Sequence, residues 1–281
     1  MSALALGLVA AFCWGFHDIC VRSLSQRVPL MASLLTVLIF GLMFHLVLMT
    51  VNDGFHAIPA QASGYAVLAG VLFLVASIGL YGAFQRGPVR LVAPIIASYP
   101  VLTVGWAAIR GVHVPLTDWA AVLAILVGVS VVAILSDEST GDVPPKGRTI
   151  FYAAVGAIGF AGTFSLGQFA TGLSDHWPVT LITRLTAIMV LVVLMLSLRL
   201  PVWPGRGALP VLALMGLADG LALVCVLAAG GLPNAQYATV ASSVFGLLTI
   251  VMAWAFLRER MTATQWTGCA VAFAGIGYLA V

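Results

Sequence analysis

Charged residues are scarce in this sequence. Only 7% of the 281 residues are Asp, Glu, Lys or Arg, whereas soluble domains carry about 25%. Hydrophobic residues make up 62% of the chain, and its mean hydropathy is +1.13. Because no soluble fold of this length can hide so much apolar surface, the composition excludes a water-soluble enzyme and predicts a membrane protein with several spans.

Catalytic and metal-binding motifs are also missing. The sequence has no GxSxG, HExxH or P-loop motif, and its four cysteines lie in apolar segments without a CxxC pair. We therefore expect no catalytic residues, no metal and no cofactor, and no ATP-driven step within this chain. The apolar start lacks a basic leader region, so we interpret it as a retained first span rather than a signal peptide.

Long apolar runs are what the sequence does have. A spanning helix needs roughly 20 mainly apolar residues, and turn-forming segments such as Asn52-Asp53-Gly54 separate the runs. The sequence therefore predicts an all-α membrane protein with ten transmembrane helices, at residues 3–22, 30–51, 64–84, 91–110, 116–135, 150–170, 178–198, 209–229, 236–256 and 262–281.

The two halves of the chain resemble each other around a polar linker. The linker, SDESTGDVPPKGR at residues 136–148, follows the fifth span. Near the ends of the halves, Thr103 matches Thr249 and Trp119 matches Trp266. Two repeats of five helices joined in series point in opposite directions, because five is odd, and inverted repeats are frequent in transporters. We predict a first repeat at 1–136, a linker at 137–149 and a second repeat at 150–281.

Basic residues indicate the orientation of the chain. The even-numbered loops hold only Arg110, and the odd-numbered loops hold ten basic residues: Arg22, Arg27, Arg86, Arg90, Lys146, Arg148, Arg199, Arg206, Arg258 and Arg260. Because basic loops stay in the cytoplasm, we predict that the odd loops are cytoplasmic and that both termini are periplasmic, in the inner membrane of a bacterium.

Several motifs resemble a known transporter family. They are AFCWG at residues 11–15, Pro178 with Arg184, Ser242-Ser243, and AWAFLRER at residues 253–260 followed by QWTG at 265–268. Together they resemble the ten-helix EamA-type branch of the drug/metabolite transporter superfamily, and the likeness covers the whole chain. The resemblance implies an alternating-access carrier with a central cavity, and it places spans five and ten at the periphery. The sequence departs from the family pattern at His17-Asp18 and lacks an acidic partner of Glu259 in the first half.

Polar residues in the first span are the first candidates for a binding site. A charge inside a span is costly and by default functional, so Asp18 is a candidate site for a proton or cation. The alternative is a structural pair with Arg22, four residues further on the same helix face. His17 either titrates or packs through a hydrogen bond. Trp14 either stacks on a ligand or packs against another span.

The second half offers an arginine and a carboxylate. Arg184 suits a substrate carboxylate or phosphate, and its alternative is an interhelical ion pair with Asp219, whose neighbouring glycines allow close helix packing. Gln168 either donates to a ligand in the cavity or is solvated at a helix end.

Corresponding interruptions occur in spans four and nine. Pro100 should kink span four because it removes a backbone hydrogen bond, and Gly246 lies at the matching place in span nine. We predict a hinge there, with binding residues nearby: Tyr99, Ser242 and Ser243. Glu259, at the cytoplasmic edge, is predicted to form a gate or ion pair.

These observations predict a secondary transporter, proton-coupled or facilitative, that moves a small polar metabolite such as an amino acid, in the direction of export. The mixed lining of Asp18, Asp219 and Arg184 suits a zwitterion. The alternative is a proton-coupled antiporter of organic cations that uses Asp18. A membrane scaffold is supported only by small-residue faces such as Gly268, Ala272 and Gly275. The expected partners are the bilayer, the substrate and, if transport is coupled, protons; nucleic acid is excluded, and the chain is a monomer or a homodimer.

Overall fold

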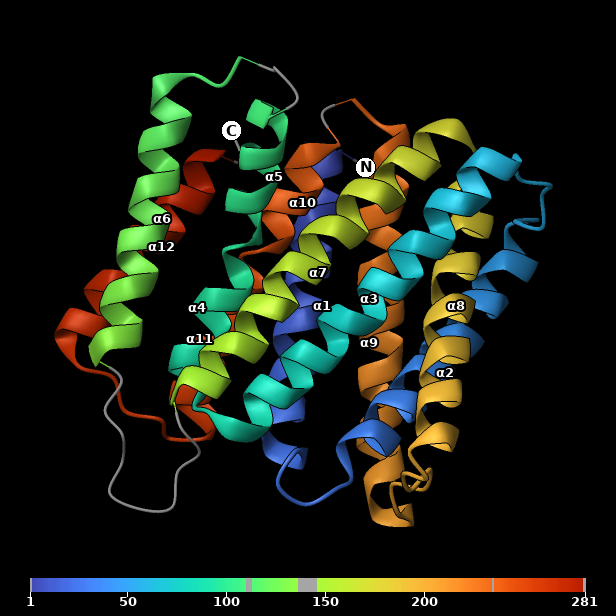
Figure 1. Ribbon diagram of the computed structural model, residues 1–281, viewed down its shortest axis with the longest axis horizontal. Coiled ribbons are helices and arrows are strands. Elements are labelled where there is room, and N and C mark those ends of the chain that lie inside the picture. The colour runs from blue at the N-terminus through green and yellow to red at the C-terminus, as the bar shows by residue number, and fades with distance from the viewer. Residues whose placement is uncertain (1, 110–112, 136–145, 234, 280–281) are drawn as a thin grey trace.

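The computed structural model describes residues 2–109, 113–135, 146–233 and 235–279, which form a bundle of α-helices without strands (Figure 1). The first half contains α1 (Ala3–Leu24), α2 (Leu30–Val51), α3 (Ala60–Arg86), α4 (Val89–Ala97), α5 (Tyr99–Ile109) and α6 (Leu116–Leu135). The second half contains α7 (Lys146–Leu173), α8 (His176–Ser197), α9 (Leu209–Ala228), α10 (Gln236–Ser242), α11 (Phe245–Phe256) and α12 (Ala263–Leu279). Short 3-10 turns flank α9: η1 (Arg206–Ala208) and η2 (Ala229–Gly231). Most of the predicted linker lies outside the described residues.

Two helices, α1 and α8, begin at a residue whose side chain caps the helix. The side chain of Ser2 accepts a hydrogen bond from the backbone N–H of Ala5 at 3.2 Å, and that of Asp175 accepts one from Trp177 at 2.8 Å. The third and sixth spans start earlier than predicted, at Ala60 instead of residue 64 and at Lys146 instead of residue 150.

Spans four and nine are each interrupted near their middle. The fourth span divides into α4 and α5 at Ser98, two residues before Pro100. The ninth divides into α10 and α11 between Ser242 and Phe245. At both breaks serine hydroxyls donate to nearby carbonyls, Ser98 to Ile95 at 2.7 Å and Ser243 to Val240 at 2.6 Å. These local bonds compete with the helical pattern, so both breaks are stabilised by their own sequence.

The two halves pack as inverted repeats. Helix α1 packs on α9, α10 and α11, and its counterpart α7 packs on α3, α4 and α5. In Figure 1, α1 begins and α12 ends at the same end of the bundle, here called the terminal end, and α5 and α10 lie in that half. Helices α4 and α11 lie toward the opposite end, here called the basic end because the described Arg-rich loops, at residues 25–29, 87–88, 198–208 and 257–262, are there.

Most of the predicted spans have the length that a bilayer requires. Within the described residues, eight helical segments are long and apolar enough to cross a membrane. The two remaining helices, α6 with 20 residues and α12 with 17, pack on each other at the side of the bundle (Figure 1). A Cβ built on Gly268 lies 2.9 Å from the Gly128 carbonyl oxygen. The small-residue face of α12 is therefore covered by α6.

Candidate functional site

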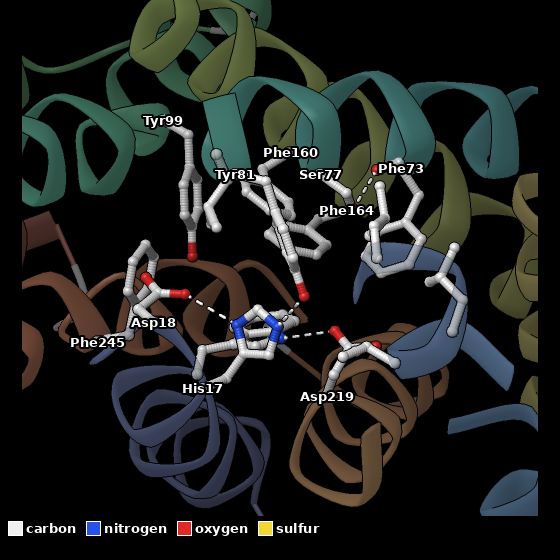
Figure 2. Close-up of a pocket in the computed structure, with 15 residues that line it drawn as sticks. His17, Asp18, Phe73, Ser77, Tyr81, Tyr99, Phe160, Phe164, Asp219 and Phe245 are labelled. Atoms are coloured by element: carbon white, nitrogen blue, oxygen red, sulfur yellow. Dashed lines mark hydrogen bonds and ion pairs between the residues drawn. The ribbon is translucent and has the colours of Figure 1, made fainter. Parts of the chain in front are cut away.

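A narrow cavity lies inside the bundle, and about 20 Å³ of it is accessible to the centre of a water molecule. Helices α1, α2, α3, α5, α7, α9 and α11 line it, so both halves of the chain contribute (Figure 2). All the lining residues are buried, so little of this lining is exposed at the molecular surface.

The cavity lining is mainly aromatic and aliphatic. Seven lining residues carry aromatic rings: Trp14, Phe73, Tyr81, Tyr99, Phe160, Phe164 and Phe245. The rings of Trp14 and Phe164 stack with centroids 5.3 Å apart, and Phe160 and Phe164 stack at 5.7 Å. The aliphatic lining consists of Leu34, Val37, Leu38 and Leu80, and the polar lining of His17, Asp18, Ser77 and Asp219.

Asp219 of α9 is fully engaged with its neighbours. Its Oδ2 accepts a hydrogen bond from Arg184 Nη1 at 2.8 Å, and its Oδ1 accepts one from Trp14 Nε1 at 3.2 Å. The side chain of Arg184 is 0% exposed, and Arg184 does not line the cavity. Of the two alternatives for Arg184, the structure therefore contains the interhelical ion pair, and the positive charge does not face the cavity.

Asp18 of α1 is only half engaged. Its Oδ1 lies 3.0 Å from His17 Nδ1, and His17 Nε2 lies 3.1 Å from the Tyr81 hydroxyl (Figure 2). Its other oxygen, Oδ2, is buried without a hydrogen-bond partner, and the residue is 0% exposed. A buried carboxylate oxygen without a partner is costly, which makes Asp18 the polar group of the cavity with binding capacity to spare.

The predicted pair of Asp18 with Arg22 is wrong. Arg22 Nε lies 3.5 Å from Glu259 Oε1, and Arg22 Nη1 donates to the Phe84 carbonyl oxygen at 2.8 Å. Glu259 also accepts from the backbone N–H groups of Val89 and Arg90, at 3.2 and 3.4 Å. Arg22 points toward the basic end, where it joins α1 to the segment after α11, and Asp18 points into the bundle.

The remaining candidates take different places around the cavity. The Tyr99 hydroxyl lies 2.6 Å from Ser242 Oγ and donates to the Thr239 carbonyl oxygen at 2.8 Å, so α5 is tied to α10 beside the cavity. Ser242 and Ser243 are fully buried and do not line the cavity. Gln168 donates to the carbonyl oxygens of Val226 and Ala235 and is likewise outside the lining.

The two predicted hinge residues lie at the helix breaks. Pro100 is the second residue of α5, directly after the break at Ser98. A Cβ built on Gly246 lies 2.6 Å from Ala97 Cβ, so this glycine allows α11 to cross α4 closely. Both residues are placed where the discontinuous helices pass each other.

The sequence interpretation missed five of the aromatic rings and Ser77. The missed rings belong to Phe73, Tyr81, Phe160, Phe164 and Phe245. A signal existed in the spacing: Phe160 and Phe164 are four residues apart, as are Phe73 and Ser77, so each pair shares a helix face. Nothing in that spacing tells a face that lines a cavity from a face that meets lipid.

The fold and the enclosed cavity between two inverted repeats define a membrane transporter. The model of the EamA-like transporter family matches residues 1–134 and 147–281, so the chain belongs to this family. An uncharacterized transporter of Archaeoglobus fulgidus is 26% identical over 196 residues, which cover 69% of this chain and 67% of that protein. A crystal structure with 15% sequence identity superposes with a TM-score of 0.71 over 99% of this chain and 97% of its own, which shows the same fold. Family and relative indicate a transporter rather than an enzyme.

Proposed function

We propose that this protein exchanges a small organic cation for protons and that Asp18 binds both. The observation that carries this proposal is the free Oδ2 of Asp18, which is fully buried in a mainly aromatic and aliphatic cavity. A bound proton removes the charge of the carboxylate, and a bound ammonium group compensates it. Either ligand therefore relieves the cost of burying an unpaired charge.

The aromatic rings support an organic cation over a metal ion. Cations bind favourably over the faces of Trp, Tyr and Phe, and Tyr99 and Phe245 line the same cavity as Asp18 (Figure 2). Among the described residues, no three His, Cys, Asp or Glu side chains gather to hold a metal.

Competition for one carboxylate supplies the coupling in this proposal. Because the proton and the cation share Asp18, the site releases one when it binds the other. The excess of Arg and Lys at the basic end favours a cytoplasmic location of that end, with both termini in the periplasm of a bacterial inner membrane. A proton gradient directed inward would then drive the cation outward, so we propose export.

The lining of the cavity favours the organic cation over the zwitterion, which was the first choice from the sequence. A zwitterion needs a positive group in the lining for its carboxylate, and Arg184 is engaged with Asp219 behind the lining. His17 is the one described lining residue that can carry a positive charge, and both of its ring nitrogens already have partners. We therefore place the amino acid second to the cation.

Three ligands that differ mainly in charge test the proposal. Phenethylamine is a cation, phenylalanine a zwitterion and 3-phenylpropionate an anion, and all three carry the same ring. We expect phenethylamine to raise the apparent melting temperature of the purified protein, because a ligand that binds the native state stabilises it. Asp18→Asn should abolish this shift, and the exposed Asp53→Asn should keep it.

Exchange is then measured in proteoliposomes. Uptake of phenethylamine should move protons in the opposite direction in the wild type and not in Asp18→Asn. If phenylalanine raises the melting temperature more than phenethylamine does, and Asp18→Asn loses this shift, the substrate is a zwitterion rather than a cation. Cation transport that survives Asp18→Asn would contradict the proposal.

A further inference from the structure

A second hollow lies between α5 and α7, in the half of the bundle toward the terminal end (Figure 1). This groove has an empty volume of about 690 Å³ and is lined by residues that include Leu102, Thr103, Trp106, Ile158 and Ser165. Trp106 and Ile158 are 57% and 60% exposed. Since both residues lie in apolar spanning helices, the groove opens toward the lipid.

Two rings of the central cavity lie on the same helices as this groove. Tyr99 and Phe164 line the cavity, and the groove is lined by their helix neighbours, Leu102 and Thr103 on α5 and Ser165 on α7. The rings of Tyr99 and Phe164 meet edge to face, with centroids 5.4 Å apart. This pair of rings therefore links α5 and α7 on the cavity side of the groove.

The inverted counterpart of the groove is closed. In the second repeat the corresponding contact joins α11 to α1, toward the basic end. There a Cβ built on Gly15 lies 3.0 Å from Leu248 Cβ and 3.2 Å from Met252 Cε, so the helices touch. The Arg22–Glu259 ion pair lies at the same end. The two halves therefore differ: one contact is packed, and the other holds a groove.

We propose that the α5–α7 groove is a lateral portal of the transport path. It accommodates the apolar part of an amphipathic organic cation that moves between the membrane and Asp18, and Tyr99 and Phe164 form the partition that moves aside. The positive charge of the ligand in this proposal is taken from the proposed function. Its location rests on the groove, on the contact of Tyr99 with Phe164 between α5 and α7, and on the packed counterpart between α1 and α11.

Filling the groove tests the portal. Ser165 is partly buried and faces open volume, so Ser165→Phe should fold. We expect this variant to bind phenethylamine as the wild type does and to transport it at least about tenfold more slowly, as blocked conformational steps do. Val193→Phe, at a 64% exposed position of α8 outside the groove, is the matched control and should transport at the wild-type rate. Transport at the wild-type rate in Ser165→Phe would overturn the portal. The groove would then hold only a lipid chain and would not carry the substrate.

A labelling experiment tests the location without any substrate. In a background with the four native cysteines changed to Ala, Ser165→Cys and Leu248→Cys are each treated with N-ethylmaleimide in proteoliposomes. We expect faster modification of Ser165→Cys, because the α5–α7 groove is open and the α1–α11 contact is packed. Equal rates, or faster modification of Leu248→Cys, would overturn the portal. If Ser165→Cys is modified faster but phenethylamine does not bind, the proposed cation substrate is wrong, and the evidence that the groove is open remains.

Discussion

Asp18 and Asp219 line the same cavity from α1 and α9, yet their surroundings differ. Both oxygens of Asp219 have partners, Arg184 on one side and Trp14 on the other. Asp18 has His17 on one oxygen and nothing on the other. A satisfied buried ion pair holds helices together, and an unsatisfied carboxylate is free to bind a ligand. The comparison separates, within one lining, an acid whose two oxygens both have partners from an acid with one oxygen unpaired.

Breaking the ion pair of Asp219 should have the largest effect on stability. The Arg184 and Asp219 side chains are 0% and 7% exposed, and removing one partner leaves the other charge buried. We expect Asp219→Asn and Arg184→Gln each to lower the free energy of unfolding by about 3–5 kcal/mol. Denaturation in mixed micelles of detergent and SDS measures this loss.

The double variant is the control for this prediction. In Asp219→Asn/Arg184→Gln no charge remains buried without a partner, so most of the stability should return. A double variant as unstable as the sum of both single variants would show that the pair does not act as a unit. Asp53→Asn, at an exposed site, should stay within about 0.5 kcal/mol of the wild type.

The same substitution at Asp18 should act in the opposite direction. The amide that replaces this carboxylate would keep one oxygen toward His17 and remove a charge that is fully buried. We expect Asp18→Asn to leave the free energy of unfolding unchanged or to raise it by up to about 1 kcal/mol, although it abolishes cation binding. The same denaturation in mixed micelles measures the free energy of unfolding of both the Asp18 and the Asp219 variants. A loss comparable to that of Asp219→Asn would show that Asp18 is structural.

The fold could be predicted well from the sequence because it depends on composition and local rules. The apolar runs gave the spans, and Pro100 marked the interruption that the structure has at Ser98. The packing of α1 on α9 to α11, mirrored by that of α7 on α3 to α5, follows from the repeat that Trp119 and Trp266 indicated. Length, hydropathy and the odd number of spans in each repeat were sufficient for this architecture.

The site was less predictable because it depends on tertiary neighbours. The spacing of Asp18 and Arg22 fits a helical pair, but Arg22 has Glu259 within reach from the other end of the chain. The aromatic rings that line the cavity were even harder to predict from the sequence. Phe164 is 0% exposed and lines the cavity, whereas Phe169 on the same helix is 47% exposed. Hydropathy scores both alike, so only packing distinguishes a cavity wall from a surface that meets lipid.

The ion pair of Arg22 and Glu259 should have the smallest effect on stability and a measurable effect on conformation. Its side chains are 25% and 15% exposed, and the two charges are 3.5 Å apart. We expect Arg22→Gln to lower the free energy of unfolding by less than about 1 kcal/mol. Because the pair lies where the α1–α11 contact is packed, its loss should speed the modification of Leu248→Cys by up to about fivefold.

Salt distinguishes this pair from that of Asp219. Screening weakens charges that water reaches and hardly affects buried ones, so added salt should speed the modification of Leu248→Cys in the wild type and have no further effect in Arg22→Gln. The exposed Arg206→Gln is the matched control and should keep the salt response. The stability difference between the wild type and Asp219→Asn should not depend on salt. If salt leaves the modification of Leu248→Cys unchanged, the pair at the basic end does not hold α1 and α11 together, and their packing rests on Gly15, Leu248 and Met252 alone.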